Sequence, residues 1–181
     1  MHKVAIVGQG PNRTAWEHGL ELGIKWFGAT SPNTKLKAEI FRLAERYCSK
    51  VAITGSVGSK LAVLAGLDPY TFRTSFARRN LHARWNGKIG RGDRFDRVEA
   101  EVAAKSLRDQ PFESYVLLGM NVAKAFGVNA NEWLAVVEET DSKRFLIFPH
   151  PSGINRWWND ALNRDAARKA LRSFLNINRS T

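Results

Sequence analysis

Short runs of branched and aromatic apolar residues alternate along this chain with longer stretches of helical spacing, and that alternation constrains the fold most. The strand-like runs are 3–7 (KVAIV), 51–54 (VAIT), 115–118 (YVLL) and 145–148 (FLIF). The helical stretches are 14–22, 36–48, 60–65, 99–108, 122–126 and 160–175. Strands separated by helices are typical of a mostly parallel sheet with helices on its faces. We therefore predict an α/β fold, a three-layer α/β/α domain around a central, mostly parallel four-stranded sheet.

The length and hydrophobicity of the chain fit one domain spanning residues 1–181. A chain of 181 residues can bury a continuous core, and we find no linker, internal repeat or low-complexity tract in it. Its 44% hydrophobic content excludes a disordered protein. No apolar run approaches the ~18 residues that cross a bilayer, which excludes an integral membrane protein.

Charge and cysteine content point to the partner and the compartment. The chain has 28 Lys+Arg and 17 Asp+Glu, and 28 − 17 gives a formal charge of +11. Such an excess marks a polyanion partner such as nucleic acid, and a basic surface that serves solubility is the alternative. The single cysteine, Cys48, can form neither an internal disulfide nor a cysteine-based zinc or iron–sulfur site. We expect a reducing, cytoplasmic setting, a monomer, and no metal or other cofactor.

Ligands of parallel α/β sheets bind where loops leave the carboxyl ends of the strands. The loops that meet this condition are 8–13, 54–59, 119–121 and 149–156. Two nucleotide-binding interpretations of these loops are incomplete. The dinucleotide fingerprint that begins at 8–10 (GQG) has Arg13 in place of its third glycine and is interrupted by Pro11. The segment 55–60 (GSVGSK) lacks the Gly-Lys-Ser/Thr ending of a P-loop.

The first and last of these loops together carry a family resemblance. Segment 7–12 (VGQGPN) follows the first predicted strand, and segment 150–156 (HPSGINR) follows the last one. The pair resembles the two motifs of the uracil-DNA glycosylase superfamily, and segment 150–156 is similar to the Asn-Pro-Ser-Gly-Leu-Ser-Arg version of mismatch-specific members. Segments 55–62 and 117–123 and the pair Asn80-Leu81 are similar to intermediate segments of the family, so the resemblance covers roughly residues 3–160.

The resemblance implies a monofunctional DNA glycosylase, which hydrolyses the N-glycosidic bond of a flipped pyrimidine and leaves an abasic site. It makes His150 the donor that stabilises the departing base. Two alternatives stay open for the water: Gln9 or Asn12 only positions it, or an acid elsewhere in the chain acts on it. The resemblance assigns base binding to Asn80, Gly8 and Gly10. It assigns DNA binding to Ser56, Ser152, Gly153, Ile154, Asn155 and Arg156, with Ile154 as the apolar wedge that fills the vacated stack. The plainer alternative for His150 and Asn80 is a residue that caps a turn.

Two departures from the family pattern bear on the substrate. Gly10 stands where other members carry an Asp or Asn that acts on water, and Gln9 stands where another branch has Glu, so the first motif holds no carboxylate. Asn12 replaces a Tyr that excludes 5-substituted pyrimidines in uracil-specific members. We therefore expect a preference for a 5-modified pyrimidine, hydroxymethylated or glucosylated, over uracil, with a role in repair or in anti-phage defence.

The basic residues cluster in two regions that we expect to contact DNA. Residues 71–108 hold ten Lys/Arg against four Asp/Glu, and residues 156–181 hold six against two. The expected partner is single- or double-stranded DNA, including phage DNA with modified bases, and no membrane. Two other classes stay open: a non-catalytic module that binds a modified base, and a nucleotide-binding α/β enzyme.

Overall fold

The structure is a computed structural model that describes residues 3–11, 13–28, 33–50, 52–53, 55–89, 92–129, 131–139, 142–152 and 155–177. The helices are α1 (Arg13–Phe27), α2 (Thr34–Lys50), α3 (Gly55–Ala65), α4 (Pro69–Ser75), α5 (Arg97–Arg108), α6 (Met120–Ala125) and α7 (Ala161–Phe174), with a 3-10 turn η1 (Arg156–Asn159). The strands are β1 (Val4–Gly8), β2 (Ala77–Asn80), β3 (Lys88–Ile89), β4 (Gly92–Asp93), β5 (Ser114–Leu118), β6 (Val136–Glu138) and β7 (Arg144–Phe148).

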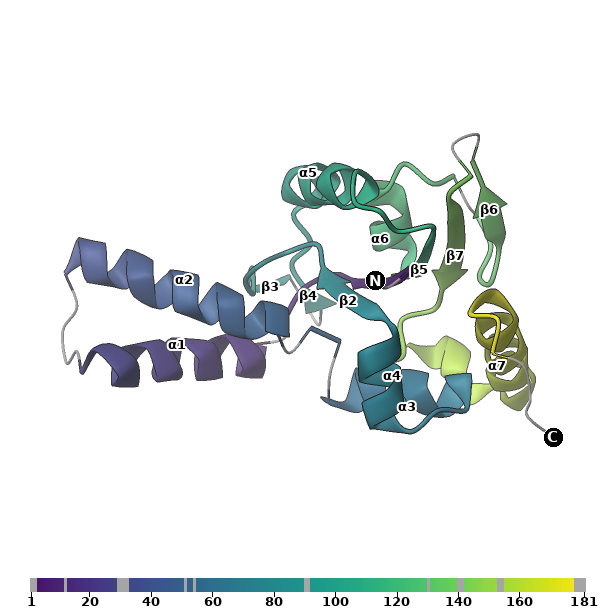
Figure 1. Ribbon diagram of the computed structural model, residues 1–181, viewed down its shortest axis with the longest axis horizontal. Coiled ribbons are helices and arrows are strands. Elements are labelled where there is room, and N and C mark those ends of the chain that lie inside the picture. Colours follow the sequence, from purple (N-terminus) through teal and green to yellow (C-terminus); the bar gives the residue numbers. More distant parts are fainter. Residues whose placement is uncertain are drawn as a thin grey trace.

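A mixed five-stranded sheet with the order β2-β1-β5-β7-β6 lies at the centre of the molecule (Figure 1). Strands β2, β1, β5 and β7 run parallel to one another, and β6 pairs antiparallel with β7. The α/β class predicted from the sequence is confirmed. The prediction of four strands is wrong, because the short edge strand β6 adds an antiparallel fifth.

The strand predicted at 51–54 is also wrong. Of that run the structure describes Ala52 and Ile53, which form a turn, while Val51 and Thr54 lie outside the described residues. Ile53 has a φ of 50°, in the left-handed region, where an extended strand cannot continue. The strand beside β1 is instead β2, whose sequence ARRN has too few apolar residues to be recognised as a strand.

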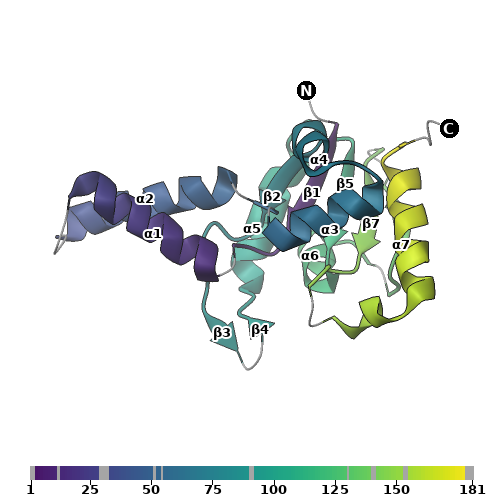
Figure 2. The same cartoon turned by 90° about the horizontal axis from the view of Figure 1, so that it is seen from below.

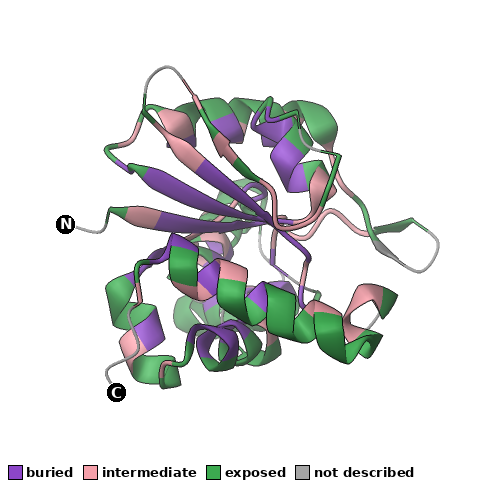
Figure 3. Ribbon diagram, turned by 90° about the vertical axis from the view of Figure 1, so that its right-hand side faces the viewer, coloured by how far each residue is buried: buried purple, intermediate pink, exposed green. Residues whose placement is uncertain are grey.

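Successive side chains of the central strands β1, β5 and β7 point to opposite faces of the sheet, so they belong alternately to two hydrophobic cores. The side chains of Ala5, Val7, Tyr115, Leu117, Phe145 and Ile147 belong to the core shared with α5 and α6. The side chains of Ile6, Val116, Leu118, Leu146 and Phe148 belong to the core shared with α3, α4 and α7. Figure 3 shows the buried strands between helices whose outer surfaces are exposed. Burial on both faces explains why these strands are nearly continuous apolar runs.

Helices α1 and α2 form an antiparallel arm that extends away from the sheet (Figures 1 and 2). The helices approach closely because glycines face the partner helix: a Cβ on Gly19 or Gly23 would lie 3.1 Å from Ala44 or Ile40. At the base of the arm, Trp16 and Cys48 are buried in a small cluster with Trp85 packed against it. The arm is therefore anchored at one end only.

The described part of segment 86–95 contains a two-stranded hairpin. Strands β3 and β4 pair antiparallel, with Lys88 opposite Asp93.

Within the described residues no single helix is long and apolar enough to cross a membrane, although the bent pair Thr34–Ala65 and Pro69–Ser75 reaches the required length and composition.

Replacing Gly58 with alanine is expected to destabilise the protein. An added Cβ at this buried position of α3 would lie 2.3 Å from the carbonyl oxygen of Ile53, which is rigid backbone. Overpacking of this kind costs about 1–3 kcal/mol, which outweighs the roughly 1 kcal/mol that alanine gains over glycine in a helix. Urea unfolding measures the change, with Val63→Ala on the exposed face of α3 as the control. An unchanged or higher midpoint for Gly58→Ala contradicts this packing.

Candidate active site

A cavity of about 490 Å³ opens at the carboxyl ends of the parallel strands. The described residues that line it come from the two motif loops, from the ends of β2 and β5, from α3, from the base of the arm and from the β3–β4 hairpin. They are Gly8, Gln9, Gly10, Pro11, Ala15, Cys48, Ile53, Gly55, Ser56, Val57, Asn80, His82, Arg84, Trp85, Asn86, Asp93, Arg94, Leu118, His150 and Ser152. The structure thus brings seven of the twelve predicted site residues to one cavity. These are Gly8, Gln9, Gly10, Asn80, Ser56, His150 and Ser152.

The first motif is held by a backbone ladder with the segment after β2. Gly8 pairs with Asn80 in the parallel register, and beyond the strand ends His82 N–H donates to the carbonyl of Gln9 at 2.8 Å. The two glycines permit this approach: a Cβ on Gly8 would lie 3.3 Å from Asn80 Oδ1, and one on Gly10 would lie 3.0 Å from His82 Cβ. Asn80 is therefore placed by strand pairing at the wall of the cavity, rather than in an irregular turn.

His150 follows the last parallel strand, and its backbone is fixed by the next turn of chain. Its carbonyl accepts hydrogen bonds from Trp158 Nε1 at 2.9 Å and from Asn155 Nδ2 at 3.3 Å. Asn155 also caps η1, since its Oδ1 accepts from Trp157 N–H at 3.1 Å. Both polar atoms of the Asn155 side chain are thus used inside the loop, a positioning contact that was not predicted from the sequence.

The environment of His150 favours a neutral imidazole. Burial lowers the pKa of His150, the carboxylate of Asp93 raises it, and the ammonium group of Lys60 lowers it further. Desolvation is the largest of these effects, so the net shift is downward from 6.5. A neutral imidazole keeps one N–H that can donate into the cavity.

Helix α3 supports the second motif from the side. Lys60 Nζ donates to the carbonyl of Pro151 at 3.3 Å, which ties the start of the 150–156 loop to the helix. Ser56, in the first turn of α3, and Ser152, in the loop, line the same cavity. The two hydroxyls lie at the side of the cavity where the second motif meets α3.

Gln9 reaches across the cavity to the β3–β4 hairpin. Its Nε2 lies 3.4 Å from the carbonyl oxygens of both Asp93 and Arg94, at the long end of the hydrogen-bond range. The hairpin therefore contributes to the wall of the cavity beside Gln9. Among the predicted residues, Asn12, Gly153 and Ile154 lie outside the described residues, and Arg156 lies exposed at the start of η1.

The contribution of residues 82–94 to the site was not predicted. Asp93, Trp85, Arg84 and Arg94 line the cavity, although the local pattern indicates only an Arg-rich loop with glycines. His82 is 2% exposed, with Nδ1 3.2 Å from Glu99 Oε2 and its ring packed edge-on against Phe95. No local motif identifies these residues, because their contacts form only when the chain folds back at the hairpin: Trp85 contacts Asp93, and His82 contacts Phe95 and Glu99.

The described residues contain no group of three or more His, Cys, Asp or Glu side chains that could hold a metal ion. Comparison with known proteins adds no family assignment: no family model, no curated protein and no solved structure matches this chain.

The lowered pKa of His150 predicts a specific pH dependence of stability. Below about pH 6.5 the unfolded chain takes up the proton before the folded chain does, so the free energy of unfolding falls as the pH decreases through this range. His150→Gln is expected to lose that part of the pH dependence. Urea midpoints between pH 5 and about 7.5 measure it, and NMR titration of the His150 ring gives the midpoint directly. A ring midpoint at or above 6.5 contradicts the buried, neutral state.

Proposed function

We propose that this protein is a monofunctional DNA N-glycosylase, which binds a flipped pyrimidine in the cavity and hydrolyses its N-glycosidic bond. The proposal includes a preference for a 5-modified pyrimidine, hydroxymethylated or glucosylated, and a role in the cytoplasm in repair or anti-phage defence. Helices on both faces of the sheet agree with the three-layer architecture that the family resemblance implies.

The observation that carries the proposal is the meeting of the two motif loops in one cavity. Segment 8–11 follows β1 and segment 149–152 follows β7, and β5 separates these strands in the sheet. Their side chains nevertheless line one space together with Asn80, which ends β2. Three segments far apart in sequence thus line the cavity with the His150 ring, the Asn80 amide and the glycine-rich backbone at 8–10. This combination suits recognition of a flipped base.

The chemistry follows from the residues on either side of the base. When the bond between C1′ and the base nitrogen breaks, the electron pair leaves with the base, and negative charge develops on its carbonyl oxygen. The neutral imidazole of His150 donates a hydrogen bond to that oxygen. Asn80 offers both a donor and an acceptor to the edge of the base. A water oxygen bonds to C1′, and the products are an abasic sugar and the free base.

Hydrolysis without a lyase step is the simplest outcome for this cavity. A lyase needs an amine that attacks C1′, and the described residues that line the cavity include no lysine. Lys60, on α3, donates from its Nζ to the carbonyl of Pro151 and lies outside the lining. Abasic product should therefore stay uncleaved until it is treated with alkali.

The test is base excision from a panel of oligonucleotides that carry uracil, hydroxymethyluracil, hydroxymethylcytosine or its glucosylated form. We expect abasic product with the 5-modified bases and less with uracil. His150→Ala is expected to lower the single-turnover rate about 10²–10³-fold, as loss of a donor to developing charge does, while DNA affinity is retained. His18→Ala, on the exposed face of α1, is the matched control.

Each result has a distinct meaning. Product from uracil in clear excess over the modified bases contradicts the proposed substrate preference but keeps the glycosylase. Tight binding of a modified base without any abasic product, from unmodified protein, indicates the non-catalytic DNA-binding module. Full activity of His150→Ala removes the donor role from His150.

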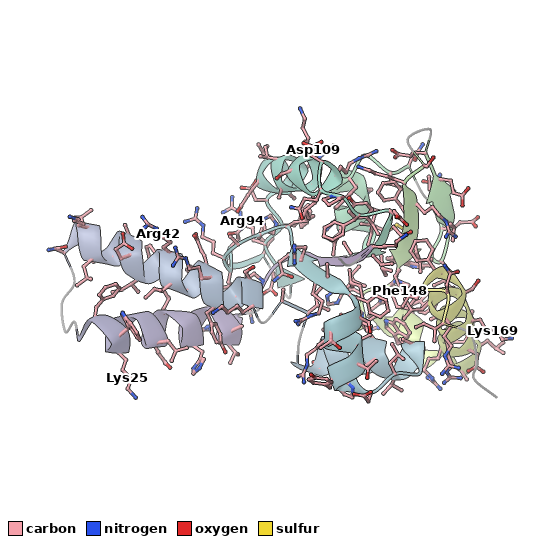
Figure 4. The ribbon with its side chains drawn as sticks, in the orientation of Figure 1. Lys25, Arg42, Arg94, Asp109, Phe148 and Lys169 are labelled. Carbon is pink, nitrogen blue, oxygen red and sulfur yellow. The ribbon has the colours of Figure 1, made fainter. Side chains whose placement is uncertain are left out.

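Basic side chains line part of the cavity and also gather on α7. Arg84 and Arg94 line the cavity, and Arg168, Lys169 and Arg172 line a separate pocket at α7. In Figure 4, Arg94 lies near the arm and Lys169 at the opposite end of the molecule. A DNA strand that enters the cavity would therefore meet positive charge beside the base pocket.

DNA affinity is expected to fall steeply with salt. Each phosphate neutralised adds roughly −0.9 to the slope of log K against log salt for a duplex. Arg94→Ala is expected to reduce the magnitude of this slope by about 1. The control is Arg97→Ala on the exposed side of α5, where Arg97 is paired with Glu101. Fluorescence anisotropy at several salt concentrations measures the slope, and a flat response contradicts a surface that follows phosphates.

A further inference from the structure

Asp93 is the only carboxylate among the described residues that line the cavity. It lies in β4, on the β3–β4 hairpin, and it is exposed. The described residues of the two motif loops contribute no carboxylate to the cavity. The one carboxylate in the described lining thus comes from a segment outside these loops.

Three contacts fix the position of Asp93. Trp85 Nε1 donates to Asp93 Oδ1 at 3.0 Å. The Gln9 amide approaches the backbone carbonyl of Asp93 at 3.4 Å, and the strand register pairs Asp93 with Lys88. The Trp85 ring packs at the base of the arm, where Arg13 lies 5.8 Å from its centre. One carboxylate oxygen is therefore held, while Oδ2 makes no hydrogen bond within the described part of the chain.

Hydrolysis of a glycosidic bond is faster when a second group, besides the donor to the leaving base, takes a proton from the attacking water. Water attacks C1′ from the face opposite the base, so a single side chain cannot serve both faces. His82 is unsuited to this task, because both its ring nitrogens are buried away from water. The Asp93 carboxylate and the His150 ring line the same cavity, and the negative charge of Asp93 raises the pKa of His150. One cavity therefore offers both a ring donor and a carboxylate.

We infer that Asp93 is the general base of the reaction, with Trp85 and Gln9 as the residues that position it. This inference rests on the proposed glycosylase function. The Oδ2 atom of Asp93 accepts a proton from water as the water oxygen forms its bond to C1′. The bond from C1′ to the base nitrogen breaks, and the base departs with the electron pair while His150 donates to its carbonyl oxygen. The proton on Asp93 then returns to solvent, and the base is protonated.

The test compares Asp93→Asn with wild-type protein on the oligonucleotide that gives the most abasic product. Loss of a general base lowers rates by about 10²–10⁴-fold, so we expect a single-turnover rate reduced by that factor with DNA affinity retained. Asp93→Glu is expected to recover part of the rate, since it restores the carboxylate. Glu101→Gln removes one negative charge from the exposed face of α5 and is the control for the change in net charge.

Two further measurements separate catalysis from folding. Trp85→Phe keeps a ring at the base of the arm and removes the donor to Oδ1, so it is expected to lower the single-turnover rate less than Asp93→Asn does. Thermal unfolding checks that each variant is folded.

The outcomes distinguish this inference from the function on which it rests. Active wild-type protein and equally active Asp93→Asn overturn the role of Asp93 and keep the glycosylase. Wild-type protein that gives no abasic product from any base of the panel overturns both. A lower rate in Asp93→Asn that Asp93→Glu does not restore in any part also overturns the general-base role.

Discussion

The site depends on one interaction, the close parallel pairing of the chain after β1 with the chain after β2. The ladder continues past the strand ends, where Leu81 N–H donates to Gly8 O at 3.0 Å and His82 N–H donates to Gln9 O. A side chain at position 8 or 10 would require a neighbouring side chain to shift, since an added Cβ would lie 3.3 Å from Asn80 Oδ1 or 3.0 Å from His82 Cβ. Glycine at these positions therefore permits the close approach of the two segments.

A chain of contacts connects this ladder to the other polar groups of the cavity. Gln9, held by its backbone, extends its amide to the carbonyls of the β3–β4 hairpin. The hairpin presents Asp93, and Trp85 holds the carboxylate from the side of the arm. The arm joins the sheet only through its base, so its contribution to the cavity is local. The base of the α1–α2 arm thus supports one side of the cavity through its contact with Trp85.

The sequence predicts those parts of the structure that local patterns determine. β1, β5 and β7 are buried on both faces, so each appears as a continuous apolar run. β2 is an edge strand whose Arg78, Arg79 and Asn80 are only half-buried, and backbone pairing with β1, rather than apolar burial, makes it a strand. Motif order was sufficient to place His150 and Gly8 in one site. Asp93 could not be predicted, since its contact with Gln9 joins residues 84 positions apart through a hairpin of two-residue strands.

The two proposed reaction groups differ in burial as their tasks require. His150 is half-buried, and desolvation lowers the pKa of its ring, which favours the neutral imidazole. The neutral ring can donate a hydrogen bond without carrying a buried charge. Asp93 is exposed on its hairpin and keeps contact with solvent. A general base must collect a water molecule, whereas a donor to the leaving base must exclude water so that its hydrogen bond is strong. In the proposed reaction, the half-buried His150 contacts the base, and the exposed Asp93 on the hairpin contacts the water that attacks the sugar. One cavity thus satisfies both conditions.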